Sequence, residues 1–78
     1  MLKIIDIELL NNIISMMVLI EGNDSLAYNL QVICDNDEFP VVKSDIPDED
    51  EMYERQARIA LRKYIGRSYP ETITSHWF

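Results

Sequence analysis

The spacing of apolar residues changes near Ser44, and this change most constrains the fold. In residues 2–34, apolar side chains largely follow the two-residue period of β-strands. From Ser44 to Gly66, apolar residues instead recur every three or four positions, which is the spacing of one helix face. Separate stretches of the two patterns predict an α+β fold, with a small antiparallel β-meander followed by one amphipathic helix.

Three strands and a short fourth are expected before the helix. The first two, residues 2–10 and 13–20, are joined by Asn11-Asn12, a pair that favours a tight turn. A third strand follows at residues 26–34. Residues 39–42 predict a short edge strand, because Pro40 cannot donate a backbone hydrogen bond.

The helix is predicted to begin with Ser44 or Asp45 as its cap and Pro47 in its first turn, and to stop at Gly66. We expect about 18 helical residues packed on one face of the sheet. The whole chain, residues 1–78, should form one domain, with a meander at 1–43, the helix at 44–66 and a C-terminal strand or arm at 67–78. The expected core consists of Ile5, Ile7, Leu9, Met16, Val18, Ile20, Tyr28, Leu30, Val32, Tyr53, Ala57, Leu61 and Tyr64.

Charge divides the chain into two unlike parts. Residues 1–51 carry twelve acidic side chains against two lysines, whereas residues 52–78 carry a net charge of about +3. The total is −7. An acidic end and a basic helix face suit contact with another protein or with a second copy of the chain.

A chain of 78 residues buries a limited core and usually needs additional stabilisation. Cys34 and His76 are the only cysteine and histidine, so an internal disulfide and a structural zinc site are excluded. Association with a partner or with a second copy of the chain is therefore the expected source of this additional stabilisation.

A partner interface is predicted where one sheet face lacks a helix and where adaptable or basic side chains gather. Arg55, Arg58 and Arg62 form one helical stripe; its simplest interpretation is a solvated face, and the alternative is contact with an acidic protein surface. The overall negative charge disfavours direct nucleic-acid binding. The candidate interface comprises Ile13, Met17, Leu19, Arg55, Arg58, Arg62, Trp77 and Phe78.

An acidic patch is the second candidate site, although acids at the start of a helix are also explained by its dipole. If these side chains shared one surface, the chain could mimic nucleic-acid phosphates and inhibit an enzyme that handles nucleic acid. The patch would comprise Asp35, Asp37, Glu38, Asp48, Glu49, Asp50 and Glu51.

Catalysis is not expected. No nucleophile has a base and an orienting group at a suitable spacing, and with Gly22 and Gly66 as the only glycines no glycine-rich phosphate loop is possible. A small hydrolase or metal enzyme would require carboxylates gathered around His76. We expect no catalytic residue, no cofactor, no metal and no small-molecule substrate.

The expected function is a non-enzymatic protein-interaction module, a structural or assembly subunit of phage or mobile-element type that associates with itself or with a larger complex. The alternative is the acidic inhibitor described above. The apolar stretch at residues 13–20 is too short to span a membrane, and charged residues interrupt the first nine positions. A cytoplasmic protein, or one incorporated in a viral particle, is therefore expected, with no membrane partner.

Overall fold

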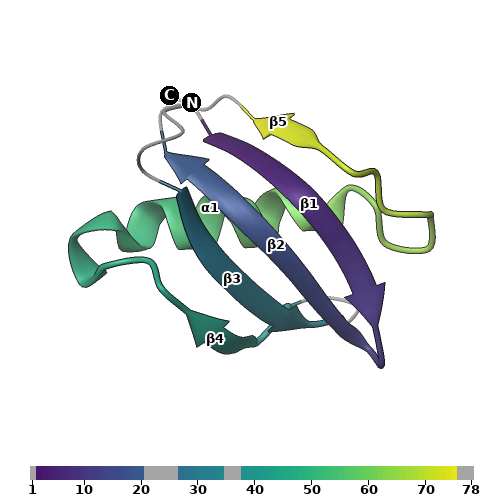
Figure 1. The fold of residues 1–78 in the computed structure, drawn as a ribbon. Coiled ribbons are helices and arrows are strands. Elements are labelled where there is room, and N and C mark those ends of the chain that lie inside the picture. Colours follow the sequence, from purple (N-terminus) through teal and green to yellow (C-terminus); the bar gives the residue numbers. More distant parts are fainter. Residues whose placement is uncertain (1, 21–26, 35–37, 76–78) are drawn as a thin grey trace.

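The computed structural model describes residues 2–20, 27–34 and 38–75. These residues form an antiparallel sheet with one helix packed across one of its faces (Figure 1). The α+β prediction is confirmed, but the sheet has five strands where a meander of three to four was expected. The additional strand comes from the C-terminal arm, which pairs with the first strand.

The strands are β1 (Leu2–Leu10), β2 (Ile13–Ile20), β3 (Ala27–Ile33), β4 (Val41–Ser44) and β5 (Ile73–Ser75). Their order across the sheet is β4-β3-β2-β1-β5, and all neighbours are antiparallel. The first four strands therefore form a meander, while β5 adds to the far side of β1. Both edge strands are short, which limits pairing with other chains through the edges.

The turn between β1 and β2 has the tight geometry that its asparagines predict. Asn11 and Asn12 have φ values of 51° and 66°, and Leu10 pairs directly with Ile13. Two left-handed residues in a two-residue loop match the twist of an antiparallel hairpin, and asparagine tolerates this conformation better than most residues. The backbone N–H of Cys34 donates to the Asn12 carbonyl at 2.8 Å, which holds the end of β3 against this turn.

A β-bulge interrupts β1 near its middle. Ile5 pairs with Met17, but the next pairing joins Glu8 to Ser15, so β1 contains one residue more than β2 over this stretch. Asp6, within the irregular stretch, has a φ of 53°. Because side chains alternate between faces, one extra residue reverses which positions of β1 point toward the helix.

The predicted core face of β1 was therefore partly wrong. Leu2, Ile4 and Ile7 are buried, whereas Ile5 is half-buried and Leu9 is exposed. Strict alternation had grouped Ile5, Ile7 and Leu9, because the bulge was not anticipated. On β2 and β3, which contain no such interruption between them, Met16, Val18, Ile20, Leu30 and Val32 are buried as predicted, Tyr28 is only half-buried, and the buried Ile14 was not predicted.

The helix is shorter than predicted. A 3-10 turn, η2 (Asp48–Asp50), precedes α1 (Glu51–Arg62), which has 12 residues. Ser44 does not cap the helix, because it belongs to β4 and its Oγ accepts a hydrogen bond from the Ile46 N–H at 3.1 Å. Gly66 lies four residues beyond α1 with a φ of 78°, a left-handed conformation that suits the end of the helical segment.

One face of the sheet, here called the covered face, packs against Ala57, Ala60 and Leu61 of α1. Phe39 and Ile46 complete this core from the segments flanking β4, and neither was predicted. Tyr28, Tyr53 and Tyr64 pack at its margin rather than in its centre. The buried cluster comprises Leu2, Ile4, Ile7, Ile14, Met16, Val18, Leu30, Val32, Phe39, Ile46, Ala57, Ala60, Leu61 and Ile73.

Candidate functional site

A pocket between α1 and the segment before β4 is here called the arginine pocket. It has a volume of about 410 Å3 and is lined by Glu38, Arg55, Arg58, Ile59 and Arg62. Four of these residues come from α1, and Glu38 comes from the segment that leads into β4. The pocket is therefore bounded by a regular helix on one side and by the connection between β3 and β4 on the other.

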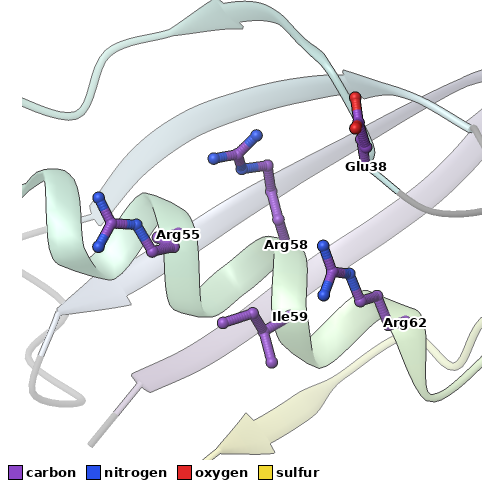
Figure 2. Close-up of a pocket in the computed structure, with 5 residues that line it drawn as sticks. All are labelled: Glu38, Arg55, Arg58, Ile59 and Arg62. Atoms are coloured by element: carbon purple, nitrogen blue, oxygen red, sulfur yellow. The ribbon is translucent and has the colours of Figure 1, made fainter.

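Helical geometry explains why the three arginines share this pocket. Positions three and four apart in a helix lie on the same side, so Arg55, Arg58 and Arg62 form one row. Figure 2 shows Arg58 between Arg55 and Arg62, with Glu38 across from Arg58 and Arg62. The stripe predicted from the sequence is present and opens into a concave surface.

The electrostatic balance of the arginine pocket is opposite to that of the chain. Its side chains carry three positive charges and one negative charge, whereas the chain as a whole carries −7. Arg55 forms a long ion pair with Glu51, with Nη2 3.9 Å from Oε1 and both side chains more than 60% exposed. Such a pair is weak in water, so it competes little with another anion.

Arg58 has a buried atom whose hydrogen-bonding capacity is not used. Its Nε is shielded from solvent and has no hydrogen-bond partner among the described residues. The side chain as a whole is half-buried, unlike those of Arg55 and Arg62, which are exposed. A buried donor without a partner is energetically costly, so such donors are rare in folded proteins.

The other sheet face, here called the open face, has no described helix packed on it. Leu10, Ile13 and Ile33 lie side by side on this face in three adjacent strands, because Ile13 pairs with both other residues. Leu10 is 73% exposed and Ile33 is 38% exposed. We call these three residues the apolar row.

The register of the hairpin between β1 and β2 determines the composition of the apolar row. Leu10 pairs with Ile13, whereas its neighbour Leu9 pairs with Ile14, which is buried on the covered face. The predicted core face of Ile5, Ile7 and Leu9 already places Leu10 on the opposite side of β1. The sequence prediction nevertheless left Leu10 out of the candidate interface.

The other predicted residues of the open face differ in accessibility. Met17 is half-buried, and Leu19 is only 4% exposed. Leu19 lies between Lys3 and Ala27 in the neighbouring strands. The exposed apolar surface is therefore displaced from Leu19 toward the turn that joins β1 and β2.

The predicted partner interface divides into two surfaces. Ile13 and Met17 belong to the open face, whereas the arginine row lies on the helix that packs on the opposite face. Trp77 and Phe78 lie outside the described residues, as does His76. Any single partner contact would use one of these surfaces or bridge them around an edge of the sheet.

The acidic candidates also occupy separate places. Glu38 lines the arginine pocket, while Asp48, Glu49, Asp50 and Glu51 lie in η2 and at the start of α1. Arg55 and Arg58 follow directly along the helix. Asp35 and Asp37 lie outside the described residues.

A smaller pocket lies beside the bulge. It has a volume of about 250 Å3 and is lined by Asp6, Ile7, Glu8 and Glu71. The Ile7 N–H donates to the Glu71 carbonyl at 3.3 Å, which ties the bulge to the segment before β5. Within residues 2–20, 27–34 and 38–75, no three His, Cys, Asp or Glu side chains are grouped so that they could hold a metal ion.

Cys34 and Tyr69 form a contact at the margin of the core. Cys34 Sγ lies 3.7 Å from the Tyr69 hydroxyl, and both residues are partly buried. Partial burial, together with the adjacent Cys34 thiol, raises the pKa of Tyr69 to about 12. This contact joins the end of β3 to the segment that follows α1.

α1 has only 12 residues, and the part of the chain that the structure describes contains no helix with the length and apolar character to span a bilayer.

The chain was compared with protein-family models, with curated proteins and with solved structures, and none of the three comparisons found a match.

Proposed function

We propose that this protein is a non-enzymatic interaction subunit that associates with a second copy of itself, or with a larger assembly, through the open face of its sheet. The apolar row is the observation that supports this proposal. Leu10, Ile13 and Ile33 are contiguous, belong to the regular part of the sheet and include a leucine that is 73% exposed. Contiguous exposed apolar surface on a small domain is typical of an interface.

Energetic reasoning supports burial of the apolar row by another chain. Removing apolar surface from water contributes about 25 cal/mol per Å2, so covering exposed leucine and isoleucine side chains favours association. Strand backbones hold the row, so little conformational entropy is lost when a partner covers it. Polar side chains of Asn29, Gln31 and Lys43 lie farther along the same face and could form the rim of an interface.

The alternative, an acidic inhibitor that mimics nucleic acid, has less support. Such a protein needs a continuous acidic surface, but Glu38 lies with the arginines and the remaining described candidates lie at the start of α1. If this alternative were correct, replacing those acids with Asn or Gln would abolish binding to the target enzyme.

Solution mass measured over a wide concentration range tests the proposal. We expect the mass of the wild-type protein to rise with concentration, and Leu10→Lys to weaken association by about tenfold or more because it places a charge in the apolar row. Leu9→Lys is the matched control, since Leu9 is adjacent, 51% exposed and directed to the opposite side of the sheet. Equal effects of the two substitutions, or a wild-type protein that stays monomeric at every concentration, would contradict self-association through this face.

A further inference from the structure

We infer that the arginine pocket binds a compact oxyanion with two negative charges, such as a phosphate group or a dicarboxylate. This inference does not depend on the apolar row, which lies on the opposite side of the molecule. It rests on the arrangement of Arg55, Arg58 and Arg62 and on the state of Arg58 Nε.

The three arginines line one pocket. α1 is a regular helix, and the row of three side chains lines a single pocket instead of spreading around the helix. A guanidinium group offers several N–H donors in a planar fork that matches the oxygens of a carboxylate or phosphate. Figure 2 shows Arg58 between the other two arginines, so its guanidinium group is the expected centre of an anion site.

Arg58 Nε provides the second observation. This buried donor makes no hydrogen bond to a described residue, although the side chain extends from α1 toward Glu38 across the pocket (Figure 2). An anion would contact the Arg58 guanidinium group through its terminal Nη atoms, because Nε itself is shielded from solvent. That contact would be charge-assisted, which strengthens it relative to a hydrogen bond between neutral groups.

The charge balance favours a compact dianion. Among the described residues of the pocket lining, three arginines and Glu38 sum to a formal charge of +2. An extended polyanion such as nucleic acid would also approach the acids at the start of the helical segment, Asp48, Asp50 and Glu51. Glu51 precedes Arg55 by about 6 Å along the helix axis, within the distance of about 8 Å over which charges still repel at physiological salt.

Ile59 adds an apolar contact to the site. It lines the pocket beside the arginines and is 40% exposed. A ligand with a short carbon skeleton could pack against this side chain while its oxygens bind the guanidinium groups. The pocket volume of about 410 Å3 is sufficient for a small anion of this kind.

NMR titration of the arginine side-chain and backbone N–H signals tests the inference. The probes are inorganic phosphate, succinate and chloride at matched ionic strength. We expect saturable shifts centred on Arg58 with phosphate or succinate, and only small, non-saturating shifts with chloride. A single-stranded oligonucleotide is the fourth probe, and it should bind no more tightly than phosphate.

Three substitutions sharpen the test. Arg58→Gln should weaken phosphate or succinate binding by about tenfold or more, because it removes the positive charge of the guanidinium group. Arg67→Gln is the matched control, since it makes the same charge change at an exposed residue outside the pocket lining, and it should alter affinity less than about twofold. Glu38→Gln should tighten binding by about threefold or more, because it removes the competing carboxylate from the pocket.

Several results of these titrations would contradict anion binding in the arginine pocket. Similar responses to all anions, or equal losses with Arg58→Gln and Arg67→Gln, would show that the anions only screen charge and would overturn the inference. Tighter binding of the oligonucleotide than of phosphate would overturn the preference for a compact ligand. If Arg58→Gln failed to fold, as judged by its circular dichroism spectrum, Glu38→Gln would still decide, because unchanged or weaker binding in that variant contradicts the inference.

Discussion

The covered and open faces of the sheet are built from alternate residues of the same strands, yet they have different roles. On the covered face, Leu2, Ile4, Ile14, Val18, Leu30 and Val32 have no exposed surface. On the open face, Leu19 is buried, but Leu10, Ile13, Met17 and Ile33 are half-buried or exposed, and polar residues such as Asn29 and Gln31 share the face. A single helix can seal only one face of a sheet. The covered face therefore supplies most of the stability, and the open face remains available for contact.

The largest expected effect comes from replacing one leucine on each side of this comparison with alanine. Leu61→Ala should lower the free energy of unfolding by about 2 to 5 kcal/mol, because Leu61 is fully buried between α1 and the sheet. Leu10→Ala should change it by less than about 0.5 kcal/mol. Urea unfolding followed by circular dichroism, at a protein concentration low enough to suppress association, measures both values. Similar losses would show that the open face is also sealed.

Substitutions in the bulge of β1, which determines which β1 residues lie on each face, should have an intermediate effect on stability. Asp6 has a φ of 53°, a conformation that glycine adopts easily and that β-branched residues strongly resist. Asp6→Val should therefore destabilise the protein by about 1 to 2 kcal/mol, while Asp6→Gly should stay within about 0.5 kcal/mol of the wild type. The same urea titration measures these differences. Equal stability of the two variants would mean that the left-handed conformation at position 6 is not required.

The smallest effect concerns the margin of the covered face and appears only at high pH. Tyr69 has a pKa of about 12 in the folded protein, above its ordinary value near 10 in an unfolded chain. The folded state holds this proton more tightly, so the resulting stabilisation is present below about pH 10 and is lost as the pH rises toward 12. Unfolding curves at increasing pH should show this loss in the wild type and lack it in Tyr69→Phe. Cys34→Ala should lower the pKa of Tyr69, and an unchanged value would show that Cys34 has no part in the shift.

Much of the fold could be predicted from local patterns. The turn at Asn11-Asn12, the core positions of β2 and β3, and the buried side of α1 each follow from short-range signals in the sequence. The bulge in β1 could not be predicted from such signals, because an extra residue in a strand requires no unusual amino-acid composition. Its one signal is that omitting Asp6 leaves Leu2, Ile4, Ile7 and Leu9 in strict alternation.

The candidate site was predicted in part. Helical spacing identifies Arg55, Arg58 and Arg62 as one row, and the structure adds that they line a pocket. The presence of Glu38 in that pocket depends on how the segment before β4 packs near α1, whereas the sequence prediction had grouped this residue with its acidic neighbours and with the acids at the start of the helix. The displacement of the exposed apolar surface from Leu19 to Leu10 likewise depends on tertiary structure, since Leu19 is buried in the folded chain and Leu10 is exposed beside Ile13.

The pairing of β5 with β1 has a consequence for the order of folding. Ile4 pairs with Ile73, so closing this part of the sheet joins residues that are almost a full chain length apart. Hairpins between consecutive strands close short loops and form early, whereas closing a long loop costs more entropy and comes late. During refolding, β1 is therefore an unprotected edge until residues 73–75 arrive. In that interval a second unfolded chain competes for the same backbone groups, and rapid dilution should favour correct folding over aggregation.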